Sequence, residues 1–359
     1  MSDRPLLDTR RAVRRALASL RARSGPEPLV LVALSGGADS LALAAATAVE
    51  APKLGVRAGA LLIDHGLQTG SAEVAERAGE QASALGLGPV LVRRVRVAAG
   101  ASGGPEAAAR DARYTEFRSV AAEAGASAIL TGHTRSDQAE QVLLGIARGS
   151  GSRTLAGIPE RRPLGTECEL LRPFLGADPE ITREVTRAAC ERAELVPWDD
   201  PHNDDDRFAR VRVRRRVLPV LAEELGGGIT ASLARTADLA REDADALDAF
   251  AAEALAGLRR AEQQDAVHAP GAPGAADHEV LLPAAGIAGL PAAIRNRVIR
   301  LAGVEFGAHL SREHTLALAA LATDWRGQGP VFVPGIRGTR AAGLLRLTRQ
   351  TGSPREKRD

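Results

Sequence analysis

The stretch Ser35-Gly36-Gly37-Ala38-Asp39-Ser40 decides how this chain folds. It follows an apolar run at residues 29–34 and precedes an alanine- and leucine-rich run at residues 41–49, an order that predicts a strand, a tight turn and a helix. Two adjacent glycines let the backbone turn several N–H groups toward one point, and the helix that follows adds the positive end of its dipole. The stretch therefore predicts a phosphate-binding loop. The alternative is a glycine turn that only joins a buried strand to a helix.

This loop differs from two common phosphate-binding motifs. It is not a Walker A loop, because no Gly-Lys-Ser or Gly-Lys-Thr follows, and the third glycine of the dinucleotide fingerprint is missing. Asp39 supplies a carboxylate where a magnesium ion that bridges nucleotide phosphates would need one. We therefore expect Asp39 to be a metal ligand.

The order of strand followed by helix recurs along the next hundred residues. The predicted strands are residues 58–64, 90–97 and 126–130, and the helices after them are residues 71–85, 106–124 and a segment that ends at 147. Such alternation predicts an α/β fold, a Rossmann-like parallel sheet with helices on both faces. Ligands of these sheets bind outside the carboxyl ends of the strands, where Ser35, Asp64 and His133 would emerge.

The pattern changes after this region and predicts further parts. We expect a catalytic domain over 1–220, a long helical connection over 221–265, a smaller, mostly helical C-terminal domain over 279–352 and a disordered tail at 353–359. The segment 268–278 is rich in Ala, Gly and Pro, which is typical of a linker. The amphipathic helix predicted at 229–260 is compatible with a homodimer and equally with packing inside one chain.

Composition narrows the class of protein. The formal net charge of the 359 residues is +2, so no global basic field indicates a nucleic-acid binder, and the 3% of aromatic residues cannot support widespread base stacking. Lys53 and Lys357 are the only lysines, and the abundant arginines suit bidentate contacts with phosphate or carboxylate. Two separated cysteines, Cys168 and Cys190, indicate a reducing compartment and argue against a zinc or iron–sulfur site. No apolar run approaches the ~20 residues of a membrane span, so we expect a cytoplasmic protein without membrane contact.

Two acidic residues follow the fourth predicted strand. On a helix, Asp137 and Glu140 share the face opposite the apolar one, so we expect both carboxylates to point away from the core and to hold a cation or an amine. The alternative is local, since Thr134 and Asp137 have the spacing of a capping box. His133 likewise has an alternative as a hydrogen-bonded loop histidine.

Two groups of arginines are candidates for anion binding. Arg110 and Arg113 lie one helical turn apart and could clamp a carboxylate or phosphate, although a solvated face on which Glu106 pairs with Arg110 also explains them. The segment 207–216 is denser, and because like charges at close spacing repel, we favour a nucleic-acid partner over a structural role. Its arginines are Arg207, Arg210, Arg212, Arg214, Arg215 and Arg216.

Taken together, these residues resemble a known family. The Ser-Gly-Gly-x-Asp-Ser loop is typical of the PP-loop, or N-type, ATP pyrophosphatases, and within that group the chain is similar to the tRNA(Ile)-lysidine synthetases. The match follows the family's order over residues 25–220, whereas the C-terminal part matches loosely. The matching stretches are 35–40, 64–67, 106–114, 133–140, 148–158 with 172–175, and 198–203 with 208–210 and 213–214.

The resemblance implies a two-step reaction with ATP, Mg²⁺, free lysine and a tRNA(Ile) that bears a CAU anticodon. The oxygen on carbon 2 of the wobble cytidine attacks the α-phosphate of ATP, and the side-chain amine of lysine then displaces AMP to leave lysidine. The C-terminal domain would bind tRNA. The implied ATP-binding residues are Ser35, Gly36, Gly37, Ala38, Asp39, Ser40, Asp64 and His65. The implied catalytic residues are Asp39, His133, Asp137 and Arg113, lysine would contact Asp137, Glu140 and Arg113, and tRNA or the adenylate would contact Arg207, Arg210 and Arg214.

Some positions depart from the family pattern and leave rival functions open. A thiolase or an amidating PP-loop enzyme is one rival, although Cys168 and Cys190 supply no obvious pair for sulfur transfer. A non-catalytic RNA-binding relic of the fold is another, and the retained Asp39 and Asp137 disfavour it. The departures are Asp64 in place of Asn, Gln68 in place of Arg, Ser136 in place of Asp, Thr154 in place of Gly and Val211 in place of Asn.

Overall fold

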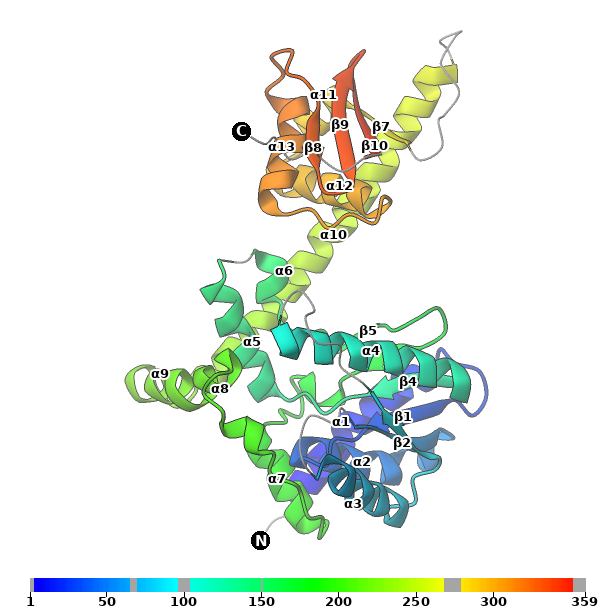
Figure 1. Ribbon diagram of the computed structural model, residues 1–359, viewed down its shortest axis with the longest axis vertical. Helices are drawn as coiled ribbons and strands as arrows, with labels where there is room; N and C mark the ends of the chain where they lie inside the picture. The colour runs from blue at the N-terminus through cyan, green and yellow to red at the C-terminus, as the bar shows by residue number, and fades with distance from the viewer. Residues whose placement is uncertain (1–2, 65–69, 96–103, 150, 268–278, 351–359) are drawn as a thin grey trace. The chain divides into compact units, whose positions relative to one another are not determined.

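The chain folds into two compact units. The computed structural model describes residues 3–64, 70–95, 104–149, 151–267 and 279–350. The first unit covers residues 1–241 and the second covers 242–359 (Figure 1). The boundary falls inside helix α10 (Ile229–Val267), part of which we expected to be a connection between domains.

A six-stranded sheet organises the first unit. Its order is β3-β2-β1-β4-β6-β5, and all neighbours are parallel except the edge pair of β5 and β6. The strands are β1 (Leu29–Ala33), β2 (Arg57–Asp64), β3 (Val90–Arg94), β4 (Ala126–Leu130), β5 (Arg161–Pro163) and β6 (Glu169–Leu171). The sheet is therefore mixed and mostly parallel. Its first four strands confirm the predicted order of strand and helix, whereas β5 was not predicted.

Helices cover both faces of this sheet. Alternate residues of β1 enter two separate cores, Val30 and Val32 one and Leu29 and Leu31 the other, as in a strand that is buried on both sides. Helices α1, α2, α3 and α7 pack into the first core, and α4 packs into the second through Phe117. The helices of the unit are α1 (Arg4–Arg21), α2 (Ala38–Glu50), α3 (Ser71–Ala84), α4 (Gly104–Ala124), α5 (Arg135–Ala147), α6 (Ser152–Leu155), α7 (Arg183–Arg192), α8 (Ala209–Arg212) and α9 (Leu218–Leu225).

The arginine-rich segment is helical. It consists of α8 and a π-helical turn, η4 (Val213–Val217), which continues into α9. The other short turns are the 3-10 helices η1 (Pro52–Leu54), η2 (Pro173–Leu175) and η3 (Pro201–Asp204). Within the described ranges no helix is by itself long and apolar enough to cross a membrane. The helices over residues 209–225 and 229–262 have the length and composition of a membrane span only when they are taken together, and they are bent by 100° relative to each other.

An antiparallel sheet organises the second unit. Its four strands have the order β7-β10-β9-β8, and the helices pack on it together with Ala251 and Leu255 of α10. The sequence predicts a mostly helical domain here, so the antiparallel sheet is a finding of the structure. The elements are β7 (Glu279–Pro283), α11 (Ala284–Gly289), α12 (Ala292–Val304), α13 (Arg312–Thr323), β8 (Val331–Val333), β9 (Ile336–Ala341) and β10 (Leu344–Arg349).

The segments that leave β1 and β4 touch each other at the carboxyl edge of the first sheet. A Cβ atom on Gly132 would lie 2.8 Å from the backbone carbonyl oxygen of Asp39 and 3.0 Å from the nitrogen of Ser40. Real Cβ atoms do not approach backbone this closely. Glycine at position 132 therefore lets the segment after β4 reach the phosphate-binding loop.

Gly132→Ala is expected to displace that loop. Overpacking of this kind costs about 1–3 kcal/mol, so the variant should melt a few degrees lower and bind nucleotide more weakly. Thermal melting and nucleotide titration measure the two effects. Gly165→Ala is the control, because a Cβ there would meet nothing within 4 Å. Equal melting and equal nucleotide affinity in the two variants would contradict the proposed contact.

Candidate functional site

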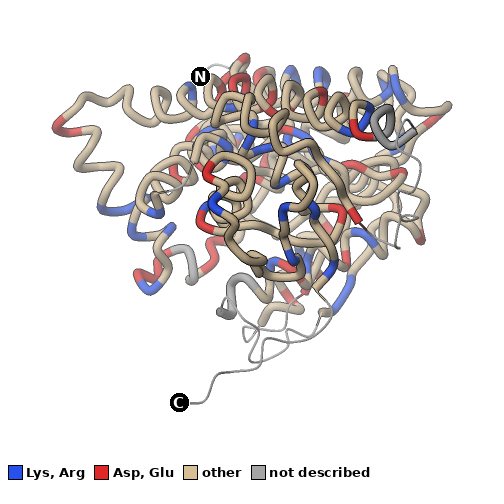
Figure 2. The backbone as a smooth tube through the Cα atoms, turned by 90° about the horizontal axis from the view of Figure 1, so that it is seen from above, with Lys and Arg blue, Asp and Glu red and all other residues tan. Residues whose placement is uncertain are grey.

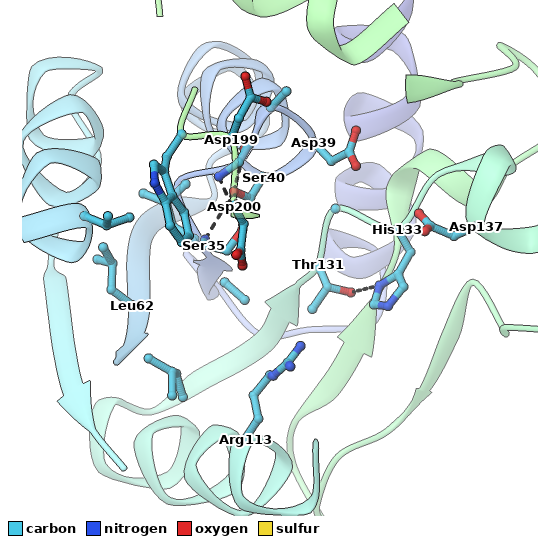
Figure 3. Close-up of a pocket in the computed structure, with 18 of the residues that line it drawn as sticks. Ser35, Asp39, Ser40, Leu62, Arg113, Thr131, His133, Asp137, Asp199 and Asp200 are labelled. Carbon is cyan, nitrogen blue, oxygen red and sulfur yellow. Dashed lines mark hydrogen bonds between the residues drawn. The ribbon is translucent and has the colours of Figure 1, made fainter. Parts of the chain in front are cut away.

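Hydroxyl groups close the phosphate-binding loop on itself. The N–H of Ser35 donates to the hydroxyl of Ser40 at 3.2 Å, and that hydroxyl donates to the carbonyl of Gly37 at 2.9 Å (Figure 3). Gly36 has a φ of +84°, a conformation that favours glycine. Helix α2 begins at Ala38, so the N–H groups of Ala38 and Asp39 have no acceptor within the helix and can bind an anion, whereas the N–H of Ser40 donates to the carbonyl of Gly37 at 3.1 Å.

A pocket of about 950 Å³ opens where β1, β2 and β4 end. Apolar side chains, among them Leu62 and Phe117, line part of it. Figure 3 shows Leu62 on the side away from His133 and Asp137. The predicted residues that line the pocket are Ser35, Gly37, Ala38, Asp39, Ser40, Asp64, Arg113, His133, Asp137, Arg210 and Arg214. This arrangement can hold a planar ring beside charged groups.

Asp39 lies in the first turn of α2 and contacts α7. The hydroxyl of Thr186 donates to one carboxylate oxygen of Asp39, and Nε of Arg183 lies 3.9 Å from the other. Burial, and next the negative charge of Asp137, raise the pKa of Asp39 to about 6, against the lowering effects of Thr186 and Arg183. Because a nearby cation favours the ionised form, this carboxylate is suited to binding one.

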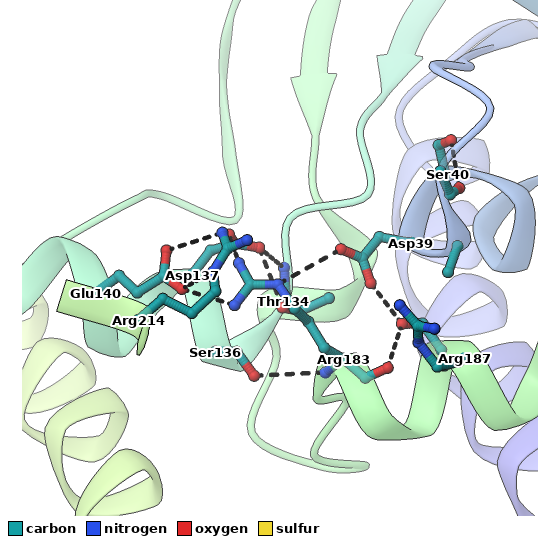
Figure 4. A network of polar contacts seen from close by, with 12 residues as sticks. Asp39, Ser40, Thr134, Ser136, Asp137, Glu140, Arg183, Arg187 and Arg214 are labelled. Atoms are coloured by element: carbon teal, nitrogen blue, oxygen red, sulfur yellow. Dashed lines mark hydrogen bonds and ion pairs between the residues drawn. The ribbon is translucent and has the colours of Figure 1, made fainter. Parts of the chain in front are cut away.

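Asp137 and Glu140 hold the guanidinium of Arg183 between them (Figure 4). Glu140 also accepts from Nε of Arg214 at 2.8 Å. The cations that these carboxylates hold in the structure are arginines of the same chain, and binding of a substrate cation or amine stays a prediction. We expected both side chains to point away from the core, and such side chains would normally be exposed to solvent. Both are buried instead. Asp137 is 8% and Glu140 0% exposed, because α7 and the arginine segment cover them.

Asp137 also caps its own helix. Its Oδ2 accepts from the backbone N–H of Thr134 at 2.8 Å and from the Thr134 hydroxyl at 3.1 Å, while Oδ1 accepts from Arg183. Burial alone would raise the pKa of Asp137, but the charge of Arg183 and several smaller contributions, among them the N–H of Thr134 and the charge of Arg210, together outweigh burial and lower this pKa. The capping interpretation and the binding interpretation of Asp137 are thus compatible, since each uses a different oxygen.

Most arginines of the segment 207–216 have acidic partners. The pairs are Arg207 with Asp205, Arg215 with Asp204, Arg216 with Asp206 and Arg214 with Glu140. Acidic and basic residues are likewise interleaved along much of the backbone (Figure 2). The repulsion that favoured a polyanionic partner is therefore largely relieved inside the protein. Arg207 does not line the pocket, whereas Arg210 and Arg214 do.

The remaining predicted residues have distinct positions. His133 lies in the pocket with Nδ1 3.0 Å from the hydroxyl of Thr131, and burial lowers its pKa to about 3, so its imidazole is neutral. Arg113 reaches the pocket from α4 (Figure 3). Arg110 lines a different cavity, so the predicted clamp of Arg110 and Arg113 on one ligand is wrong. His65 lies outside the described residues.

The positions that depart from the family pattern are accommodated locally. Asp64 pairs with Arg94 of the neighbouring strand at 3.1 Å. The hydroxyl of Ser136 accepts from the backbone N–H of Arg183 at 3.4 Å. Thr154 packs against Gly145 of α5, and Val211 is buried. Gln68 lies outside the described residues.

Sequence reasoning missed two parts of the pocket wall. Arg183 lines the pocket from α7, and Thr186 of the same helix donates to Asp39, but no local pattern sets either residue apart from other helix residues. Trp198 donates its backbone N–H to the carbonyl of Gly36 at 2.9 Å and lines the pocket. Its stretch, 198–203, was part of the family resemblance, and that signal could have identified it.

No group of three or more His, Cys, Asp or Glu side chains in the described part of the chain could hold a metal ion by itself. A magnesium ion bound to nucleotide phosphates needs less, because it keeps several waters and takes only one or two carboxylates. Asp39 fits that limited role.

The fold and the pocket define a PP-loop enzyme, a class that uses ATP, and a family profile described as "PP-loop domain" matches residues 8–221. The tRNA(Ile)-lysidine synthase of Leifsonia xyli subsp. xyli is 55% identical over 89% of this chain and 90% of its own length. Those of Salinispora arenicola and Streptomyces coelicolor are 51% and 48% identical, over 95% and 90% of this chain and 96% and 86% of their own lengths. The chain belongs to the tRNA(Ile)-lysidine synthase family.

Two further comparisons concern the separate units. A profile described as "TilS substrate binding domain" matches residues 282–350, within the second unit. Among solved structures, the U34-tRNA thiolase NcsA from Methanococcus maripaludis aligns with a TM-score of 0.54 and 17% identity, over 66% of this chain and 79% of that one. At this identity the likeness concerns the fold alone.

Asp39→Asn is expected to stabilise the ligand-free protein in a pH-dependent way. The folded-state pKa of Asp39, about 6, exceeds the value of about 3.9 for an unfolded chain. The folded protein therefore retains a proton that the unfolded chain has lost, and this group's contribution to stability falls as pH rises between these values. The variant should gain about 1–3 kcal/mol at about pH 8 and almost nothing at about pH 4. Melting curves across this range measure the gain.

Glu76→Gln, at an exposed site on α3, is the matched control and should show no such trend. A gain from Asp39→Asn that is the same at both ends of the pH range would refute the assignment.

Proposed function

We propose that this protein ligates free lysine to carbon 2 of the wobble cytidine of a tRNA(Ile) with a CAU anticodon, with lysidine, AMP and pyrophosphate as products. Membership of the family supports the reaction, because relatives about half identical over nearly the whole chain carry that activity in their names. The observation that carries the proposal is one pocket in which the PP-loop lies beside the carboxylate of Asp137, which shares the cationic side chain of Arg183 with the fully buried Glu140.

The loop and Asp39 serve the adenylation step. Residues 35–40 would bind the phosphates of ATP through backbone N–H groups, and the apolar part of the pocket near Leu62 suits the adenine ring. Asp39 would hold a Mg²⁺ ion, which would supply positive charge against the phosphates. Arg210 and Arg214 face the same pocket and suit the RNA or the adenylate. His133 would contact the nucleotide as a neutral imidazole, without adding a positive charge.

The acidic pair serves the second step. Asp137 and Glu140 would bind the ammonium group of lysine, and Arg113 would bind its carboxylate. Asp137 and Arg113 line the pocket, whereas Glu140 is fully buried and paired with Arg183 and Arg214. Arg183 contacts both acids, so substrate lysine and Arg183 would compete for the same oxygens. Asp137 and Glu140 cannot pair fully with the guanidinium of Arg183 and the ammonium group of lysine at the same time. Lysine binding would therefore require Arg183 to withdraw, at least in part.

Several expectations remain predictions. The second unit would bind tRNA, and Mg²⁺, a homodimer and a cytoplasmic location rest on the sequence and the family. Sulfur transfer is the less favoured alternative. Cys168 and Cys190 belong to cores on opposite faces of the sheet, and burial raises their pKa values to about 11 and about 12. Neither thiol would be a ready thiolate nucleophile.

Incubation with labelled lysine, ATP, magnesium and a tRNA(Ile) with a CAU anticodon tests the reaction. We expect label in the RNA and release of pyrophosphate, and both should depend on ATP. A tRNA whose wobble cytidine is replaced by uridine is the control substrate and should gain no label. Release of pyrophosphate without lysine in the RNA would contradict the lysidine assignment. Absence of both would favour a non-catalytic RNA-binding relic of the fold.

Asp137→Asn is expected to separate the two steps. Asparagine can still accept from Thr134 and so keep the cap, but it loses the charge that binds an ammonium group. The KM for lysine should rise roughly 10- to 100-fold with little change in the KM for ATP, as loss of a charged hydrogen bond predicts. Asp199→Asn is the control, because Asp199 also lines the pocket but pairs with Arg187. An unchanged lysine KM in Asp137→Asn would remove the proposed role.

A further inference from the structure

A second group of charged side chains lies on the first unit, outside the nucleotide pocket. Tyr114 of α4 lies at its centre, in contact with Arg110, Arg162 and Arg172. We call these four residues the tyrosine–arginine cluster. The guanidinium carbons of Arg162 and Arg110 lie 4.3 and 5.3 Å from the centre of the Tyr114 ring. Arg172 donates to the Tyr114 hydroxyl at 3.3 Å. The cluster joins two stretches of the family resemblance, 106–114 and 172–175, that the proposed reaction leaves largely unused.

Positive charge in this cluster is not compensated by acids. In the part of the chain that the structure describes, Arg110, Arg162 and Arg172 form no ion pair with a carboxylate. The Nε atoms of Arg162 and Arg172 are buried and have no hydrogen-bond partner. Burial lowers the pKa of Arg172, and the charges of Arg162 and Arg110 lower it further, against the opposing effect of Tyr114. The cluster thus differs from the segment 207–216, whose arginines are mostly paired.

A cavity over the cluster is open to a ligand. Its volume is about 340 Å³, and it is lined by Arg110, Asp111, Tyr114, Thr115, Arg118 and Arg162. Asp111 is the one acid among these lining residues, against three arginines. Guanidinium groups bind phosphate bidentately, and a tyrosine hydroxyl can donate to the same anion. The chemistry of the cavity therefore suits a phosphate group.

Helix α4 connects this cavity to the nucleotide pocket. Arg113 and Phe117 face the pocket, whereas Arg110, Tyr114 and Arg118 face the cavity. The two sites thus lie on neighbouring strips of one helix. A polynucleotide with a base in the pocket would continue beyond it, and its next phosphates need cationic partners.

We propose that the tyrosine–arginine cluster binds a backbone phosphate of the RNA strand whose base enters the nucleotide pocket. This inference rests on the proposed function, which supplies the RNA substrate. The cluster positions the strand and does not take part in the chemistry. Phosphate contacts of this kind set register and affinity without reading sequence.

The double variant Arg110→Gln with Arg162→Gln tests the proposal in the full-length protein. The Kd for tRNA is measured by filter binding over a range of salt concentrations, separately from turnover. We expect roughly 3- to 30-fold weaker binding at low salt, and a salt dependence whose log–log slope is smaller by about 1 for each phosphate that the variant no longer binds. The KM values for ATP and lysine should not change, and Arg110→Lys with Arg162→Lys should recover most of the affinity.

Arg93→Gln is the matched control. Arg93 is a surface arginine beside the same helix, but it pairs with Glu123 at 2.9 Å and approaches Glu116 at 3.7 Å. Because its charge is already compensated, removing it should leave the salt slope unchanged.

Three outcomes would overturn the inference. An unchanged Kd and slope in the double variant, with wild type active, removes the cluster as a phosphate site and leaves the proposed function intact. A raised KM for ATP alone would assign the anion to the nucleotide. A lowered melting temperature with parallel loss of every activity would make the cluster structural. If wild-type protein binds tRNA but adds no lysine, the proposed function fails, and the binding measurement still decides on the cluster.

Discussion

The site depends on two buried carboxylates that need positively charged partners. Asp137 and Glu140 lie on α5, just past the end of β4, and a carboxylate out of water must be paired or must lose its charge. Their partners come from distant parts of the chain, Arg183 on α7 and Arg214 on η4. Charge compensation therefore joins α7 and the arginine segment to α5, while Ala189 and Cys190 hold α7 in the hydrophobic core. Both segments line the pocket, so the pairing contributes to its wall.

Because one arginine compensates several acids, the binding of a cation at one acid affects the others. A guanidinium with five donors can bridge several acids, and Arg183 contacts Asp39, Asp137 and Glu140 together. A cation that reaches any of these acids changes the electrostatic balance at the other two. The metal-binding acid and the amine-binding acids of the proposed mechanism are therefore coupled through one side chain.

The sequence predicted the features that depend on local pattern, and missed those that depend on tertiary contacts. The loop at 35–40, the first four strands and the helices between them follow from hydrophobic period and glycine chemistry. The edge strand β5 is three residues long and has no period to detect. Burial of Glu140 could not be predicted either, since the covering residues are more than forty positions away. The positive charge of the arginine segment is compensated by Asp204, Asp205 and Asp206, which lie just before it and outside the range 207–216 on which the prediction of a polyanionic partner rests.

Two arginines one turn apart on α4 show that helical spacing alone does not predict which residues share a ligand. Arg110 and Arg113 are close enough to act on one ligand, yet they line different cavities. Arg162 of β5 and Arg172, the residue after β6, contact Tyr114, which lines the same cavity as Arg110. Paired and uncompensated arginines are indistinguishable in the sequence, and only the structure separates them.

Cys190 gives the site a built-in reporter of local opening. Its thiol is buried on α7 and lies 3.2 Å from the carbonyl oxygen of Ala38, at the start of α2. A thiol reagent can reach it only when α7 separates from α2, so the labelling rate measures the free energy of that separation. Arg183 and Thr186 belong to the same helix, and any ligand that tightens or loosens their contacts changes that rate. The kinetics of one unreactive cysteine can thus follow motion of the pocket wall in the unmodified protein.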